Sequence, residues 1–412
     1  MGRPKRAEQW TPGEIAIVHC VQRCVRRAFL AGVDPLSGQD YSYRREWIRR
    51  RLEALASVFG IDVLTYAIMS NHLHVILRTR PDVVARWSDR EVAIRWLRLF
   101  PGHRLEEHLG EPTDSDVAAL LADPQRLDIV RRRLSDISWL MRALCEPIAR
   151  MANRQDNVTG RFWEGRFKAQ RLTDEAGLLA CAMYVDLNPV RAAMASQPSQ
   201  APFTSAYDRI QAQQGQTIAS AAYPIRSIPT EQAGEILRTH TSAQIKQRKQ
   251  RQRRNPTGQR IARDGWLAPL SADASISAAD PQVHRGGVRA SDKGFLMLSW
   301  EEYRKLLEWV AAQKSPLSGH GGQSADSTKS AESAVNSGGA SGKPPAGVQG
   351  VLAKLGIDAG LWCDVVWNFG RYFGRSTCAG RSESMSRHAE RTGRRWARGQ
   401  RLADQCFSSP PT

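Results

Sequence analysis

The stretch Met69-Ser70-Asn71-His72-Leu73-His74-Val75-Ile76-Leu77 decides the fold, because it places two histidines two positions apart in an apolar, β-branched run. A β-strand alternates its side chains between its two faces, so His72 and His74 would share a face that Leu73 and Val75 avoid. Two imidazoles on one face can bind a single divalent ion. A half-buried pair at a sheet edge, without metal, is the alternative for an isolated His-x-His.

A second informative stretch, Thr173 to Met194, predicts a helix. Thr173 and the acids after it suit a helix start, and apolar residues recur at helical spacing at Ala176, Leu179, Ala180, Met183 and Leu187. Tyr184 and Asn188 are one turn apart, so they share a face of this helix. The alternative for Tyr184 is a tyrosine of the helical core.

Working outward, the hydrophobic pattern predicts the elements of an α+β domain. Strands are expected at 15–23, 61–69 and 72–78, and helices at 43–59 and 134–153, before the Tyr184 helix. The segment from about residue 81 to about residue 133 is expected to be a helical insertion of unknown role. The order indicates an antiparallel sheet with covering helices. Such a fold would let the histidine pair face the Tyr184 helix across the sheet surface.

The charge of the chain indicates a polyanionic partner. Its 412 residues carry 59 Lys and Arg against 41 Asp and Glu, a formal net charge of +18. Nucleic acid is the first expectation and an anionic membrane surface the second. Between Gly160 and Lys168 arginines alternate with aromatic residues, a mixture that suits single-stranded nucleic acid, although a strand with core aromatics and solvated arginines fits equally. The candidate DNA contacts are Arg161, Arg166, Lys168, Arg191, Lys246, Arg248, Arg251, Arg394 and Arg395.

The two stretches together resemble a known family. His-hydrophobic-His on a strand, followed by a helical tyrosine with an amide four residues later, is similar to the HUH single-tyrosine transposases. Within them, the blocks around His72 and Tyr184 resemble the IS200-like family and its REP-associated tyrosine transposase branch. The resemblance covers the chain to about Ala195. Asn188, where insertion-sequence relatives more often carry Gln, fits the REP-associated branch better.

The resemblance implies a ferredoxin-like catalytic core in which His72, His74 and Asn188 bind Mg²⁺ or Mn²⁺ and Tyr184 is the nucleophile. A free tyrosine has a pKa of about 10 and is a weak nucleophile at neutral pH. A divalent ion can polarise a phosphodiester for in-line attack. Attack by tyrosine would conserve the bond energy in a 5′-phosphotyrosine link, so no nucleotide cofactor is required. The DNA would be a single strand or a hairpin.

Three functions from different classes are consistent with the sequence. The first is a transposase-type single-strand DNA endonuclease and strand transferase. The second is a domesticated DNA-binding regulator or architectural protein without cleavage activity. The third is a rolling-circle replication initiator or relaxase, although these usually carry a third histidine or a tyrosine pair near the active helix. The relatives work as monomers or as homodimers, and the sequence does not choose between them.

Composition divides the rest of the chain. Residues 1–195 would form the catalytic domain, 196–313 a basic connecting region with short helices, and 314–348 a flexible linker rich in Ser, Gly and Ala. Residues 349–412 read as a small, basic, helical module that contacts DNA. The seven cysteines form no C-x-x-C pair, so a reducing cytoplasm is the simpler expectation. We expect no membrane span and no signal peptide.

Overall fold

The computed structural model describes residues 9–407, except 12, 26–30, 35–37, 101–111, 223–259, 278 and 314–343. The chain divides into two compact units. Unit 1 comprises Met1–Arg171 and Pro202–Met297, and unit 2 comprises Leu172–Ala201 and Leu298–Thr412. Each unit is described below by itself. This division groups the Tyr184 helix with the C-terminal residues, whereas the boundaries expected from composition stay a prediction.

Unit 1 is built on an antiparallel sheet. Strand β3 (His72–Thr79) pairs antiparallel with both β1 (Ile17–Arg23) and β2 (Ile61–Ile68). With β4 (Lys168–Leu172), whose last residue is assigned to unit 2, the strand order is β2-β3-β1-β4. This order, from a chain that runs β-α-β-β-α-β, is that of a ferredoxin-like sheet. The α+β fold predicted from the sequence is therefore confirmed.

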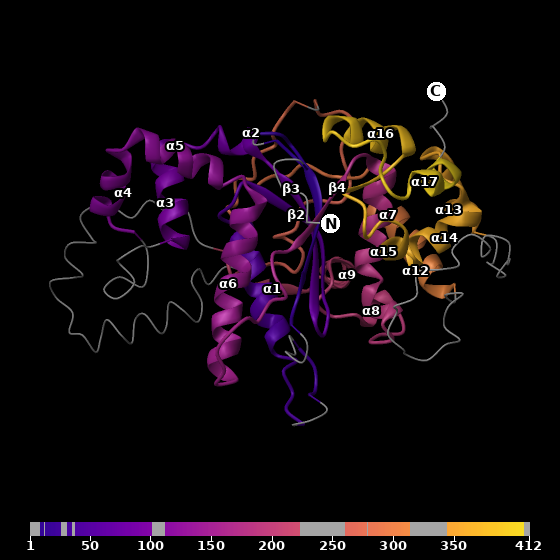
Figure 1. The fold of residues 1–412 in the computed structure, drawn as a ribbon, viewed down its shortest axis with the longest axis horizontal. Coiled ribbons are helices and arrows are strands. Elements are labelled where there is room, and N and C mark those ends of the chain that lie inside the picture. The colour runs from indigo at the N-terminus through magenta and orange to yellow at the C-terminus, as the bar shows by residue number, and fades with distance from the viewer. Residues whose placement is uncertain are drawn as a thin grey trace. The chain divides into compact units, whose positions relative to one another are not determined.

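Two long helices of unit 1 lie side by side, α1 (Arg44–Ala56) and α6 (Ile137–Gln155) (Figure 1). Ile48, Leu52 and Leu55 are buried on α1, as the predicted apolar stripe requires. Their neighbours in the same hydrophobic core include Val18, Val63, Leu73, Val75 and Leu77 of the strands and Leu140, Leu144 and Ile148 of α6. Leu73 and Val75 are thus buried in this core, as the alternation around the histidines predicts.

The segment expected as an insertion is helical where it is described. It contains α2 (Pro81–Val84), α3 (Asp89–Leu99), α4 (Asp114–Leu121) and α5 (Pro124–Arg133). Side-chain caps explain where three of these helices begin, because Ser88, Thr113 and Asp123 each accept a backbone N–H of the first turn. These residues are helical as expected, and their being an insertion in a common core stays a prediction.

The last part of unit 1 adds α9 (Ser205–Gln213) and a two-stranded ribbon of β5 (Thr217–Ala219) and β6 (Arg260–Ala262). Residues 281–297 are tied to the main sheet through a buried carboxylate. Asp62 on β2 accepts hydrogen bonds from Arg78 and Arg80 and from the Ser291 backbone N–H. The carboxylate and both guanidinium groups are almost entirely removed from solvent.

Unit 2 is mostly helical, as expected for the C-terminal region. Its first helix, α7 (Glu175–Asp186), is capped by Asp174, which accepts the Gly177 N–H, rather than by Thr173. The other elements are α8 (Asn188–Arg191), η3 (Pro198–Gln200), α12 (Trp300–Ala312), α13 (Ala346–Lys354), α14 (Ala359–Trp367), α15 (Phe369–Tyr372), β7 (Cys378–Ala379), α16 (Ser382–Arg391) and α17 (Gln400–Cys406). Every residue of α7 after Glu175 is buried, and α14 and α15 both pack against the helix.

Several sequence-based expectations concern residues outside the described part. Most of the expected linker and the basic run that contains Lys246, Arg248 and Arg251 belong to this group. Among the described residues, no helix is long and apolar enough to cross a membrane. All seven cysteines are free thiols, and six of them are buried.

Candidate active site

The histidine pair sits at the start of β3. The rings of His72 and His74 are 4.8 Å apart between centroids and meet edge to face, so the pair shares one face of the strand as predicted. His72 is half-buried and His74 is 4% exposed. The Nδ1 atom of His72 is hydrogen-bonded to Oδ1 of Asn71 at 2.6 Å. Because an amide oxygen can only accept, Nδ1 carries the proton, so Nε2 is the ring nitrogen whose lone pair could bind an ion.

A third histidine, His19 on β1, contacts this pair. Its Nε2 atom lies 2.9 Å from Nδ1 of His74, and the two rings stack at 5.1 Å between centroids. Burial lowers the pKa of His19 to about 4, while a hydrogen bond with Gln170 opposes that shift. A neutral His19 therefore orients the His74 ring at neutral pH. The sequence did not assign His19 a catalytic role. Its contact with His74 follows from the register of β1 and β3, which pairs Val21 with His74.

The donors of unit 1 fit part of a divalent-ion site. Both histidines use Nδ1 in a hydrogen bond, the usual arrangement by which a protein orients a ligating imidazole. Within the described ranges, however, no group of three or more His, Cys, Asp or Glu side chains could hold a metal ion. An ion at this pair would need oxygen ligands from elsewhere, such as an amide, water or phosphate.

Unit 2 brings together three residues of the second stretch. Nη2 of Arg191 donates to the Tyr184 hydroxyl at 3.2 Å and to Oδ1 of Asn188 at 2.8 Å. The guanidinium carbon also lies 4.8 Å from the centroid of the Tyr184 ring. Asn188 is 1% exposed, and its Nδ2 atom finds no hydrogen-bond acceptor among the described residues. Arg191, expected as a DNA contact, here links the phenol to the amide.

The Tyr184 hydroxyl is covered by the C-terminal part of unit 2. The side chain is 7% exposed, and its ring lies 5.4 Å from that of Phe369 on α15. At Gly370 an added Cβ would stand 2.9 Å from the hydroxyl oxygen, so only glycine leaves room there. Burial raises the pKa of Tyr184, and the positive charge of Arg191 partly opposes this. The phenol is therefore protonated at neutral pH in this conformation.

The histidine pair lies in unit 1, whereas Tyr184 and Asn188 lie in unit 2. The structure thus groups the candidate site residues into two clusters, His19–His72–His74 and Tyr184–Asn188–Arg191. The sequence analysis missed the role of Arg191 within its cluster, although its position three residues after Asn188 placed it on the same helical face. A shared ion between the clusters stays a prediction.

Between residues 160 and 168, the phenylalanines are buried and the basic side chains are exposed. This agrees both with a contact to single-stranded nucleic acid and with a segment whose aromatic residues belong to the core. Phe162 and Phe167 are buried, whereas Arg161, Arg166 and Lys168 are exposed. The backbone forms turns with a single bridge between Cys24 and Trp163 before β4 begins. The cationic side chains thus lie at the surface of unit 1.

In unit 2, the expected DNA contacts Arg394 and Arg395 directly precede an exposed aromatic residue, Trp396. Arg394 is half-buried and donates to Oγ1 of Thr377 at 3.1 Å, and Arg395 is exposed. Trp396 is 68% exposed, an unusual state for so large an apolar side chain. The sequence analysis did not select Trp396 as a site residue. Its position within a run of arginines was the signal available.

No family model matches the chain, and no curated protein matches its sequence. One solved structure with a similarity is described as "Structure of the REP associates tyrosine transposase bound to a REP hairpin". The two chains are 13% identical in sequence, and the TM-score is 0.29. The match covers 59% of this chain and 97% of the solved one. A similarity of this size carries no argument about the site.

Proposed function

We propose that this protein is a metal-dependent, transposase-type single-strand DNA endonuclease and strand transferase that forms a 5′-phosphotyrosine intermediate. The observation that carries the proposal is the Tyr184–Asn188–Arg191 cluster. A guanidinium group bound to a phenol oxygen is suited to receive a phosphate, because its remaining donors match two phosphate oxygens. The net charge of +18 favours a polyanionic substrate, a single-stranded or hairpin DNA.

In the proposed reaction the Tyr184 oxygen attacks a backbone phosphorus. The phosphorus bond to the 3′ oxygen breaks, and the 5′ phosphate becomes linked to tyrosine. The phenol proton is transferred through solvent to the released 3′ oxygen, which becomes a 3′-hydroxyl. Arg191 would bind the phosphate and stabilise the charge that develops on it. Because Phe369 and Gly370 cover the hydroxyl, the attack requires α15 to move away from Tyr184.

His72 and His74, with Asn188 as a third ligand, would hold Mg²⁺ or Mn²⁺. When bound, such an ion polarises the scissile phosphate and neutralises part of its charge. His19 would keep the His74 ring oriented for this role through the contact with Nδ1. Arg191 shares the Asn188 oxygen, so it must also adjust when that oxygen becomes a ligand.

The metal site gives a first prediction. His72→Gln should weaken Mn²⁺ binding by at least about tenfold, because the pair then has one imidazole left. Electron paramagnetic resonance of free Mn²⁺ in a titration of the full chain measures this directly. His284→Gln is the matched control, since His284 is paired with Asp292 in another part of unit 1. Equal Mn²⁺ affinity for wild type and His72→Gln would contradict the assignment.

The exposed tryptophan gives a second prediction. Trp396→Ala should lower the affinity for single-stranded DNA by about 1–3 kcal/mol, the usual contribution of an aromatic side chain that stacks on a base. Fluorescence anisotropy with a labelled oligonucleotide measures the change. The same substitution should leave the thermal unfolding midpoint unaltered, because Trp396 is 68% exposed. Unchanged affinity would exclude Trp396 from the DNA contact.

A DNA-binding regulator or architectural protein without cleavage activity is the second candidate. The covered hydroxyl of Tyr184 favours it, since a nucleophile that stays buried cannot reach a phosphate. Both candidates place the protein on DNA as a monomer or homodimer. The free thiols suit a reducing compartment such as the cytoplasm. A covalent DNA adduct, described in the Discussion, distinguishes the two.

A further inference from the structure

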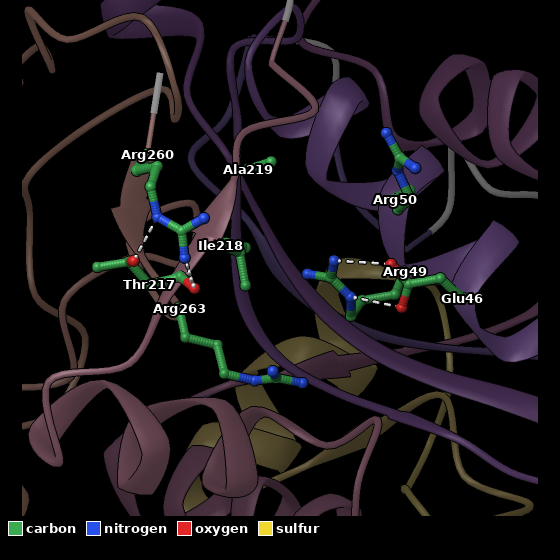
Figure 2. A pocket seen from close by; sticks show the side chains of 8 residues that line it. All are labelled: Glu46, Arg49, Arg50, Thr217, Ile218, Ala219, Arg260 and Arg263. Atoms are coloured by element: carbon green, nitrogen blue, oxygen red, sulfur yellow. Dashed lines mark hydrogen bonds and ion pairs between the residues drawn. The ribbon is translucent and has the colours of Figure 1, made fainter. Parts of the chain in front are cut away.

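Unit 1 contains an arginine-lined pocket, none of whose lining residues belongs to the stretch around His72 or to the stretch around Tyr184. Its volume is about 390 Å³, and α1 forms one wall while the β5–β6 ribbon forms another (Figure 2). The lining residues are Glu46, Arg49, Arg50, Thr217, Ile218, Ala219, Arg260 and Arg263. Four guanidinium groups therefore surround a space that has a single carboxylate in its lining.

Two of the four arginines are already neutralised. Arg49 makes a two-point ion pair with Glu46, with distances of 3.1 and 2.9 Å. Nε of Arg263 donates to the buried carboxylate of Asp208 at 2.7 Å. These contacts fix the two guanidinium groups in position at the pocket, as the dashed pair in Figure 2 shows for Arg49.

The other two arginines leave positive charge at the pocket. Arg260 is exposed and donates to Oγ1 and to the carbonyl oxygen of Thr217, at 2.8 and 2.9 Å. Both acceptors are neutral, so they orient the guanidinium group without cancelling its charge. Arg50 is exposed on α1. Its charge acts on the carboxyl group of Glu53, which is buried on the same helix, but among the described side chains the two make no direct ion pair. The pocket therefore has positive charge on two walls.

We propose that this pocket binds a backbone phosphate of the DNA. Guanidinium groups with fixed orientation match the two free oxygens of a phosphodiester. An exposed, doubly charged and partly preformed site costs little reorganisation on binding. The chain between the two strands of the ribbon also contains the basic run with Lys246, Arg248 and Arg251. The proposal deepens the proposed function, because it assigns a second DNA contact away from Tyr184.

The test is the salt dependence of DNA binding. The full chain carrying Tyr184→Phe, which prevents turnover, is compared with the same chain carrying in addition Arg50→Gln and Arg260→Gln. Fluorescence anisotropy with a fluorescein-labelled DNA hairpin bearing an oligothymidine tail suffices, since phosphate contacts do not depend on sequence. Affinity should fall about tenfold near 0.1 M salt, and the slope of log K against log salt should decrease by about 1–2.

A matched control removes the same charge elsewhere in unit 1. Arg86→Gln with Arg126→Gln changes two exposed arginines of the helical segment 81–133. This control should keep most of the affinity. An equal loss in both double variants, or no loss in the pocket variant, would overturn the proposal. Thermal unfolding of each variant confirms that the fold is intact.

A small anion is the other source of the same chemistry. Calorimetric titration with inorganic phosphate and with thymidine monophosphate tests it. The assignment to DNA would be overturned by two results together. Phosphate binding would be lost in the variant with Arg50→Gln and Arg260→Gln, and the DNA affinity of that variant would be unchanged. The two proposals can fail separately. If the pocket does not bind DNA, a covalent adduct at Tyr184 can still form. If no adduct forms at Tyr184, the salt dependence of DNA binding still tests the pocket.

Discussion

Tyr184→Phe is expected to lower the rate of single-strand DNA cleavage by at least about 10³-fold, because it removes the oxygen that forms the covalent link. DNA affinity should stay within about twofold, since phosphate contacts rather than the phenol supply binding free energy. The measurements are cleavage of a labelled hairpin in the presence of Mn²⁺ and anisotropy with the same DNA. Phe fits the space of Tyr184 against Phe369, so the fold should be preserved.

The control for this experiment is Tyr43→Phe, which removes the hydroxyl of a tyrosine that is 40% exposed in unit 1. It should cleave at the wild-type rate. If wild type and Tyr43→Phe bind the hairpin but neither cleaves it with metal present, the non-catalytic DNA-binding function gains support. Cleavage by Tyr184→Phe at the wild-type rate would assign the nucleophile to another residue.

Asp62→Ala is expected to lower the free energy of unfolding by about 3–5 kcal/mol, the usual cost of removing one partner from a buried ion pair. Its carboxylate accepts from Arg78 at 2.8 Å and from Arg80 at 3.1 Å. Without it, two buried guanidinium groups lose their common acceptor. Residues 281–297 also lose the hydrogen bond from the Ser291 backbone, and hydrogen exchange in this segment should accelerate.

Asp128→Ala provides the contrast. Asp128 pairs with Arg132 at 2.9 Å, but both side chains are more than half exposed. Because solvent screens such a pair, the expected loss is below about 1 kcal/mol. Urea unfolding monitored by circular dichroism compares both variants with wild type. Equal losses would show that the buried carboxylate contributes no more than a surface one.

The sequence predicted the local elements well, because alternation and helical spacing are local properties. The face shared by His72 and His74 follows from a strand period of two residues, and it was confirmed. The contact of His19 with His74 was not predicted, because it depends on the register between β1 and β3. Register is set by the packing of the whole sheet, which no single stretch encodes.

Tertiary contacts of the Tyr184 helix were also beyond local reasoning. The pattern of α7 identified one core face, whereas all of its residues after Glu175 are buried in the structure. Phe369 and Gly370, which cover Tyr184, come from a segment that composition assigned to a separate module. The small residues Gly177 and Cys181 recur at helical spacing before Tyr184, and they were the available signal of close packing on that side of α7. An added Cβ at Gly177 would stand 2.5 Å from the carbonyl oxygen of Ala379.

The most direct measurement of the central claim is the position of a covalent DNA adduct. The full chain is incubated with a 3′-labelled single-stranded hairpin with Mn²⁺ or with chelator, digested with protease and analysed by mass spectrometry. The account predicts a nucleotide-linked peptide modified at Tyr184 that forms only with metal and is lost in His72→Gln. An adduct on another residue, or one that forms equally well with chelator, would contradict it.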